Sequence, residues 1–250
     1  IVDEMEKNPV AITGIDRMFV WNGEPKIFFS MIKLLEDRVN IENDTRIALI
    51  RLILLVEDSP KYYSRYLPLL YGSVLDQTKR MIEDVSTDEL YKVLRIRIRP
   101  KILLAENYEE AMELFSRYKD FMLCVISDVK FFRKGKLDEH AGVSLVEQVR
   151  KELPNLPIIL QSFDRSNEET ALKLKVAFLD KNSESLMLDI KNFLSNYLGF
   201  GDFVFKDSEG NPITIASTME EFEKALRIIP DESLLYHAQK NHFSMWLAAR

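Results

Sequence analysis

The chain has 250 residues and a net charge of −6, with both signs mixed along its length. This length gives room for one to two domains with a substantial core, and the absence of a basic stripe argues against nucleic acid as a partner. The single cysteine, Cys124, lies in an apolar run, so we expect a buried core residue and no disulfide framework or CxxC metal site.

No apolar stretch reaches the ~18–20 residues that a membrane span needs, and no signal peptide precedes the first predicted strand. We therefore expect a cytoplasmic protein without a membrane contact. The chain starts at Ile1 rather than methionine, so we also expect a fragment of something longer.

The first predicted elements are a strand at Met18–Asn22 and a helix around Ile32–Leu35. One strand and one helix cannot bury their own apolar faces, so Ile1 to Arg38, within the predicted unit of residues 1–45, should pack on the main domain or on another chain. The unit aligns without gaps, at a constant offset, on a second strand and helix that begin at Val176 and Ile190. It is interpreted as the remnant of a preceding, degenerate copy of that unit. The alternative is a coincidence between two short apolar segments.

Strand-like runs and helical apolar spacing then alternate, which is typical of a doubly wound parallel α/β sheet. The predicted strands end at Val56, at Leu104 or Ala105, at Ile126 or Ser127, at Gln161 and at Asp180. The predicted helices are Glu109–Arg117, Val143–Leu153 and Glu184–Leu198, with Asn107 as a cap for the first and Ser166 or Asn167 capping a weaker segment. The expected strand order is 2-1-3-4-5.

The connection after the first strand is about twice as long as one short helix requires. Ser59 and Pro60 predict a helix start there. Its apolar face is long, comprising Tyr62, Tyr63, Tyr66, Leu67, Leu70, Tyr71, Val74 and Leu75, and a second helical piece follows near Asp88–Ile96. The favoured interpretation of this aromatic stripe is core. The alternative is an elongated helix that packs on a twin subunit or a neighbouring domain.

Polar residues follow four of the predicted strands. Glu57 and Asp58 end the first, Asp128 ends the third, Ser162 ends the fourth and Lys181 ends the fifth. Strand ends of one kind open onto one edge of a parallel sheet, so these side chains should converge. Three carboxylates suit a hard cation such as Mg²⁺, and a hydroxyl with an ammonium facing it makes a site for a phosphoryl-sized anion.

Four motifs in order, ILLVEDSP, VISDV, PIILQS and VAFLDK, resemble the receiver domain of two-component response regulators over roughly residues 46–198. The resemblance implies a flavodoxin-like fold with Asp128 as phosphoacceptor. It implies Mg²⁺ held by Glu57, Asp58, Asp128 and the backbone carbonyl of Lys130. It further implies that Lys181 and Ser162 contact the phosphoryl oxygens and that Phe178 is an aromatic switch whose ring turns inward on phosphorylation.

The chain also departs from this family pattern. Phe163 stands where a small residue usually lets phosphate enter, and Asn182 replaces a proline that usually follows the lysine in a cis bond. The segment Phe131–Lys136 enlarges the loop after Asp128. These changes favour a rival interpretation, a pseudo-receiver that never takes phosphate and serves as a scaffold or dimerisation unit. Retention of all five site residues favours the receiver.

Residues 199–250 change in character and predict a C-terminal connector. A hairpin is expected from Phe203–Phe205 and Ile213–Ile215, then a helix to Ile228 with a capping box at Thr218 and Glu221. One last helix is expected from Asp231, and the spacing of His237 and His242 indicates ordinary helix residues rather than metal ligands. This tail is similar to the connector before phosphoenolpyruvate-synthase-like regions in some large bacterial receiver proteins.

The sequence therefore predicts phosphorelay signalling. The expected partners are a histidine kinase or phosphotransfer protein and covalently attached output domains, with a homodimer as a further possibility. No enzymatic activity is expected beyond self-catalysed phosphoryl transfer and dephosphorylation. A hydrolase would need a positioned general base, and the nearby Asp164 is interpreted as a loop cap instead.

Overall fold

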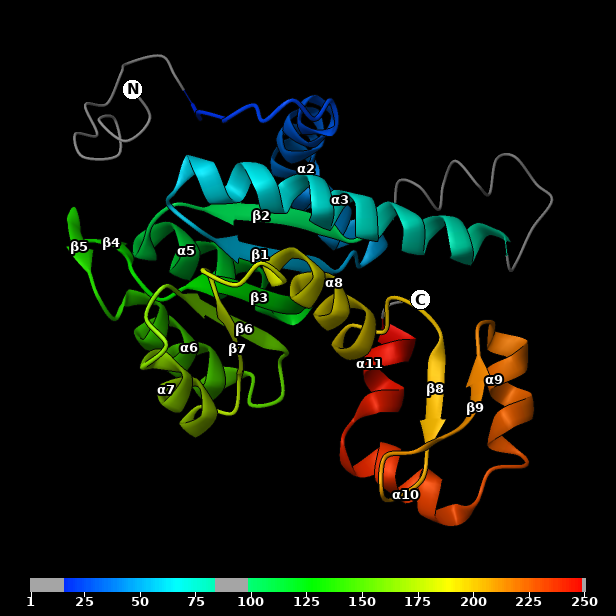
Figure 1. Ribbon diagram of the computed structural model, residues 1–250. Coiled ribbons are helices and arrows are strands. Elements are labelled where there is room, and N and C mark those ends of the chain that lie inside the picture. The colour runs from blue at the N-terminus through cyan, green and yellow to red at the C-terminus, as the bar shows by residue number, and fades with distance from the viewer. Residues whose placement is uncertain (1–15, 84–98, 249–250) are drawn as a thin grey trace.

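The computed structural model describes residues 16–83 and 99–248, and its centre is a five-stranded parallel sheet (Figure 1). The strand order is β2-β1-β3-β6-β7, which confirms the predicted doubly wound, flavodoxin-like receiver fold. The strands are β1 (Leu52–Val56), β2 (Lys101–Ala105), β3 (Met122–Asp128), β6 (Ile158–Ser162) and β7 (Ala177–Asp180). The first four of these are buried at every position, as expected for strands covered by helices on both faces.

Two hydrophobic clusters cover the two faces of the sheet. One cluster joins Ile53 and Leu55 of β1 to α3 (Pro60–Glu83) and α8 (Leu186–Tyr197). The other joins Leu52, Leu54 and Val56 to the opposite layer of helices. That layer consists of α5 (Tyr108–Tyr118), α6 (Ala141–Glu152) and α7 (Asn167–Lys173), and the 3-10 turn η1 (Lys119–Phe121) follows α5. Alternate β1 side chains thus face opposite layers, as the strand period requires.

The long connection after β1 is helical, and its aromatic stripe is core. Helix α3 runs for 24 residues from Pro60, which stands at the first helical position as predicted. Tyr63, Tyr66 and Tyr71 are buried in the cluster on that face of the sheet. This confirms the core interpretation of the stripe. The second helical piece predicted near Asp88–Ile96 lies outside the described residues.

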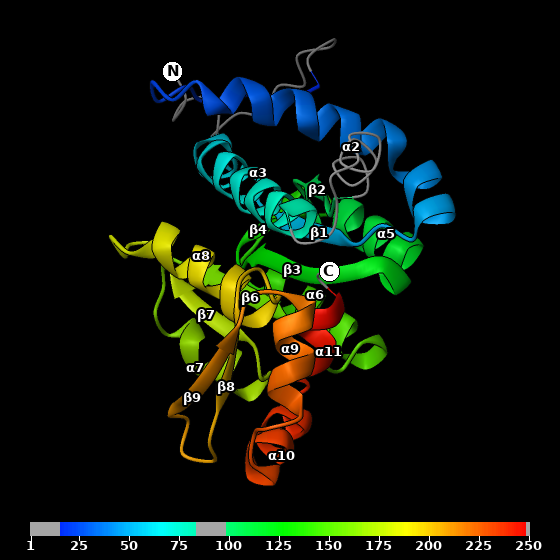
Figure 2. The same ribbon diagram turned by 90° about the vertical axis from the view of Figure 1, so that its right-hand side faces the viewer.

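The N-terminal strand expected at Met18–Asn22 does not form. The segment is irregular and lies against α3, where Val20 N–H donates to Ser64 Oγ at 2.9 Å and the Tyr63 hydroxyl donates to the Met18 carbonyl. Its polar backbone is thus partly satisfied by side chains of α3 rather than by a neighbouring strand. The helix that follows, α2 (Lys26–Ala48), does form and lies outside α3 and β2, at the opposite end of the molecule from the C-terminal helices (Figure 2).

A buried acid attaches α2 to the edge of the sheet. Asp37 is fully buried and accepts two hydrogen bonds from Arg99, at 2.7 and 3.1 Å. It also accepts from the Tyr71 hydroxyl and from the backbone N–H of Ile102 in β2, each at 3.0 Å. The sequence analysis did not identify this cluster, because an aspartate in an amphipathic helix normally faces solvent.

The enlarged loop after Asp128 is a β-hairpin. Strands β4 (Phe131–Arg133) and β5 (Lys136–Asp138) pair in antiparallel register around Lys134 and Gly135, both with positive φ. Positive φ at both central residues is the geometry of a two-residue hairpin turn. The hairpin projects beyond the sheet beside α5 (Figure 1).

The C-terminal residues form a separate hairpin with three helices. The hairpin is β8 (Phe203–Lys206) and β9 (Pro212–Ala216), and α9 (Met219–Leu226) begins at the predicted capping box of Thr218 and Glu221. The single last helix expected from Asp231 is wrong. It is divided into α10 (Asp231–Gln239) and α11 (His242–Ala248), because Asn241 adopts a left-handed conformation with φ 59°.

This break changes the interpretation of the two histidines. His237 and His242 lie on different helices, with their Nδ1 atoms 2.9 Å apart, and His237 Nε2 accepts from the Lys206 N–H at 2.8 Å. His237 also packs in an aromatic cluster with Phe203 and Phe243. Mainly because of burial, the pKa of His237 is lowered to about 4.

Within the described ranges, every helix is too short or too polar to span a lipid bilayer. Cys124 is buried in the core, as predicted, and burial raises the pKa of its thiol.

Candidate functional site at the carboxyl edge of the sheet

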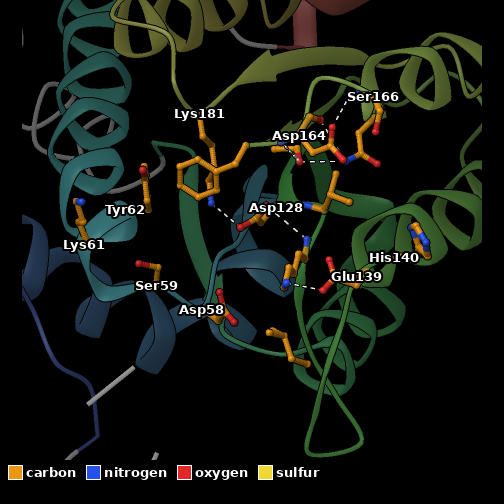
Figure 3. Close-up of a pocket in the computed structure, with 16 residues that line it drawn as sticks. Asp58, Ser59, Lys61, Tyr62, Asp128, Glu139, His140, Asp164, Ser166 and Lys181 are labelled. Carbon is orange, nitrogen blue, oxygen red and sulfur yellow. Dashed lines mark hydrogen bonds and ion pairs between the residues drawn. The ribbon is translucent and has the colours of Figure 1, made fainter. Parts of the chain in front are cut away.

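The structure brings together the five predicted site residues at the carboxyl ends of β1, β3, β6 and β7, and Figure 3 shows Asp58, Asp128 and Lys181 among them. Ligand oxygens of Glu57, Asp58 and Asp128 all lie within 4.8 Å of one another. Asp128 ends β3, Ser162 ends β6, and Lys181 directly follows β7. The predicted convergence at one edge is confirmed, while the role of each residue remains a prediction.

Lys181 lies at the centre of this arrangement. Its ammonium lies 2.5 Å from Asp128 Oδ2 and 2.7 Å from Glu57 Oε2. The Lys181 side chain is 1% exposed, so both ion pairs are shielded from water. Its position is fixed by the backbone, because the Lys181 N–H donates to the Ser162 carbonyl at 2.8 Å.

Burial and charge shape the ionisation of this cluster. The pKa of Glu57 is raised to about 8, because burial and the neighbouring carboxylates of Asp128 and Asp58 outweigh the attraction of Lys181. Burial opposes the charged form of Lys181, but the negative charges of Glu57 and Asp128 raise its pKa above the ordinary value. Glu57 is fully buried, and its Oε2 pairs with the Lys181 ammonium at 2.7 Å. One ammonium thus serves two carboxylates, and with a pKa of about 8 the Glu57 carboxyl is mostly protonated at neutral pH.

The Ser162 hydroxyl is oriented by two donors. Its oxygen accepts from the Asp164 N–H and from Asn167 Nδ2, each at 3.1 Å. A hydroxyl has one hydrogen to donate, and both contacts use only its oxygen. Asp164 itself caps the loop, because its Oδ1 accepts from the Ser166 N–H at 2.9 Å. The interpretation of Asp164 as a loop cap agrees with this geometry.

The backbone holds Asp128 firmly. Its Oδ1 accepts from the Val129 N–H at 2.7 Å, and the Gly142 N–H at the start of α6 donates to the Val129 carbonyl at 2.9 Å. A Cβ added at Gly142 would lie 2.0 Å from the Asp128 carbonyl oxygen. Only glycine permits this close approach between the helix and the strand end.

Two residues to which the family resemblance assigns a role, Lys130 and Phe178, make no side-chain hydrogen bond or ion pair with Asp128, Ser162 or Lys181 in the part of the chain that the structure describes. Lys130 lines the cavity and its side chain pairs with Glu139, and the proposed use of its carbonyl as a metal ligand stays a prediction. Phe178 is half-buried against the cluster that covers the α5 and α6 face of the sheet, three residues before Lys181. Its role as a switch also stays a prediction.

The cavity above the cluster has a volume of about 660 Å³. Glu57 lies beneath it and does not line it. The residues that line it are Asp58, Ser59, Lys61, Tyr62, Asp128, Val129, Lys130, Leu137, Glu139, His140, Ser162, Phe163, Asp164, Ser166, Asn167 and Lys181.

Three side-chain contacts around this cavity were not predicted from the sequence. Phe163 packs edge-on against Tyr62, and Asn182 Nδ2 donates to the Phe163 carbonyl at 2.9 Å. Thus the two departures from the family pattern, Phe163 and Asn182, contact each other. Asn167 also contacts Ser162, because its Nδ2 donates to the Ser162 hydroxyl oxygen. No pattern in the sequence indicated this contact, although the two residues are only five positions apart.

No protein-family model matches the chain, and a search of curated proteins likewise finds no match. Solved structures with similar folds are response regulator receiver domains. A receiver domain protein from Clostridium thermocellum is 17% identical, with 57% of this chain and 90% of that chain covered and a TM-score of 0.39. The chemotaxis protein CheY4 of Vibrio cholerae is 14% identical, with 58% of this chain and 98% of that chain covered and a TM-score of 0.39.

A third similar structure is the response regulator TrrA of Thermotoga maritima in complex with Mg²⁺ and BeF, at 20% identity, 58% and 100% coverage and a TM-score of 0.33. At these identities and scores the likeness carries no argument about function.

Proposed function

We propose that residues 46–198 form a receiver domain that accepts a phosphoryl group on Asp128 and thereby regulates attached domains. The observation that supports this most directly is the position of Lys181. A buried ammonium 2.5 Å from the Asp128 carboxylate, next to the Ser162 hydroxyl, is the arrangement that a phosphoryl group on Asp128 requires.

In the proposed reaction a carboxylate oxygen of Asp128 attacks the phosphorus of the donor. The new O–P bond forms as the P–N bond of a phosphohistidine, or the P–O bond of an acyl phosphate, breaks and the leaving group takes its electron pair. Lys181 then pairs with a phosphoryl oxygen instead of Asp128 Oδ2. Ser162 donates its hydroxyl hydrogen, since its oxygen is already an acceptor for Asp164 and Asn167.

The donor set fits Mg²⁺. Glu57, Asp58 and Asp128 offer hard oxygen ligands within 4.8 Å of one another. Glu57 and Asp128 share the one ammonium of Lys181, and the raised pKa of Glu57 indicates that further positive charge would favour its ionised form. When bound, a divalent cation would neutralise charge on the incoming phosphoryl group. The Lys130 carbonyl is proposed as a further ligand.

The second candidate function is a pseudo-receiver that never takes phosphate and acts as a scaffold or dimerisation module. The Phe163 side chain favours it, because its ring packs against Tyr62 at the mouth of the cavity. The receiver is preferred because the acids, the hydroxyl and the lysine are all in reach of one another.

We further propose a phosphoacceptor rather than an enzyme with external substrates, acting in the cytoplasm with a histidine kinase or phosphotransfer protein as donor. Residues 1–45 are proposed as a remnant of a preceding receiver-like unit, and residues 199–250 as a connector to an output domain. The relation of this connector to phosphoenolpyruvate-synthase-like proteins is a proposal from sequence alone.

The test is incubation with Mg²⁺ and acetyl phosphate, followed by intact mass spectrometry. The expected result is a single phosphoryl addition that Asp128→Asn abolishes. Asp164→Asn is the matched control, because it makes the same change at another carboxylate of the cavity and should leave labelling intact. If the natural chain, Asp164→Asn and Phe163→Ala all stay unlabelled, the phosphoacceptor proposal fails and the scaffold function is preferred.

A further inference from the structure

Two aromatic rings lie close to the ammonium of Lys181, in addition to its acidic partners. Its Nζ lies 4.4 Å from the ring centroid of Tyr62 and 5.3 Å from that of Phe163. The two rings pack edge-to-face, with centroids 5.4 Å apart. A cation within ~6 Å of an aromatic face is attracted to it, so the rings and the ammonium stabilise one another.

The two rings differ in how they are held. Tyr62 belongs to the first turn of α3 and packs in the core cluster beneath, so it is fixed. Phe163 is 52% exposed and follows the last residue of β6, in a loop tied to the Lys181 loop through Asn182. Rotation of Phe163 toward solvent would uncover Lys181 without disturbing the core.

A phosphoryl group on Asp128 needs contact with an ammonium that is 1% exposed in this arrangement. We propose that Tyr62 and Phe163 form an aromatic lid over Lys181, which opens to admit the phosphoryl group and, when closed, excludes water from the aspartyl phosphate. The inference rests on the proposed function and deepens it. Phe163 is the moving part of the lid, Tyr62 its fixed part and Asn182 the backbone tie.

The lid acts on two steps. Phosphoryl transfer to Asp128 waits for its opening. Loss of the phosphoryl group needs a water oxygen to attack phosphorus while the bond to the Asp128 oxygen breaks and the carboxylate leaves. A closed lid slows both steps, so the protein should label slowly and stay labelled for long.

The first experiment compares rates of labelling by acetyl phosphate with Mg²⁺, and rates of label loss after desalting, by intact mass. Phe163→Ala is expected to speed both about tenfold. Phe28→Ala is the matched control, since Phe28 is 54% exposed on α2, away from the cavity, and its loss should leave both rates unchanged.

The outcomes separate the two proposals. Faster labelling and loss in Phe163→Ala alone supports the lid, as does labelling that appears only in that variant. Equal rates in the natural chain and in Phe163→Ala overturn the lid and leave the phosphoacceptor standing. Absence of labelling in every variant overturns the proposed function and the lid's role with it.

A second measurement follows the lid without any phosphoryl donor. In protein labelled with ¹³C at the lysine ε carbon, the Lys181 Hε signals should be shifted upfield by the two rings. Phe163→Ala should reduce this shift, while Phe28→Ala should not. A Lys181 signal at the position of exposed lysines in the natural chain would show that the lid is open, and would overturn the inference.

Discussion

Two buried ionic clusters of this fold match their charges in different ways. The edge cluster consists of Asp37, Arg99, Lys101 and Tyr71 and attaches α2 to β2. The strand-end cluster consists of Glu57, Asp58, Asp128 and Lys181. Both bury carboxylates beside cations. In the edge cluster, however, one acid meets two cations, a hydroxyl and a backbone N–H.

The difference lies in how the charges are matched. Asp37 has donors on both oxygens, and Asp44 balances the second cation by pairing with Lys101 at 3.2 Å. In the strand-end cluster one ammonium pairs with both Glu57 and Asp128, and the pKa of Glu57 is raised to about 8, mainly by burial. A buried acid with donors on both oxygens is stabilised as the anion, whereas a buried acid that keeps its proton at neutral pH lacks the positive charge it needs to ionise. The charges of the first cluster are thus matched within the fold, while the second would be matched by the proposed Mg²⁺.

The largest expected effect is at the edge cluster. Asp37→Ala would leave Arg99 and Lys101 buried without their shared acid, and should lower the free energy of unfolding by about 3–5 kcal/mol. Urea denaturation measures it. Asp44→Asn is the control, because this partly exposed partner of Lys101 should cost less than about 1 kcal/mol. Equal effects of the two substitutions would contradict the proposed difference between a core acid and a peripheral one.

The next effect concerns pH and the strand-end cluster. Folding raises the pKa of Glu57 from 4.5 to about 8, so in this window the native state binds the extra proton. Without divalent cations, the free energy of unfolding should therefore fall as the pH rises from 4.5 toward 8, by at most about 1.4 kcal/mol per pH unit.

Glu57→Gln removes this titration, so its stability should be flatter over the same window. Urea denaturation at several pH values in a chelating buffer makes the comparison. Parallel curves of unfolding free energy against pH for the variant and the natural chain would show that folding does not raise the pKa of Glu57.

The smallest effect is stabilisation by the cation itself. At a Mg²⁺ concentration ten times the dissociation constant, the gain in unfolding free energy should be about 1.4 kcal/mol. Thermal unfolding with and without Mg²⁺ measures it. Asp58→Asn removes one ligand and should abolish most of the gain, whereas Asp164→Asn should retain it. A gain that survives in Asp58→Asn would locate the cation elsewhere.

The sequence predicted the sheet and the convergence of the site for one physical reason. Parallel strands buried on both faces appear as continuous apolar runs, and polar residues that end such runs must meet at one edge. This is why Glu57, Asp128, Ser162 and Lys181 could be grouped before any coordinates. The arrangement depended on strand order alone, not on side-chain detail.

What was missed depends on contacts between distant segments or on single backbone angles. Asp37 meets Arg99 62 positions along the chain, and no local pattern marks that pair. The break between α10 and α11 follows from one left-handed residue, Asn241, and asparagine was the signal that could have indicated it. Likewise Gly135 was the available sign of the hairpin after Asp128.

The two sides of Asp128 differ in how tightly they are packed, and Gly142 lies on the tightly packed side. Because the first turn of α6 lies directly on the Asp128 backbone, β3 and α6 can move only as one body. If Asp128 takes a phosphoryl group as proposed, we expect the response at the other wall of the site, where Asn167 contacts Ser162 and Phe163 lines the cavity. A bulkier residue at position 142 would collide with the backbone of Asp128 without changing any side chain of the site.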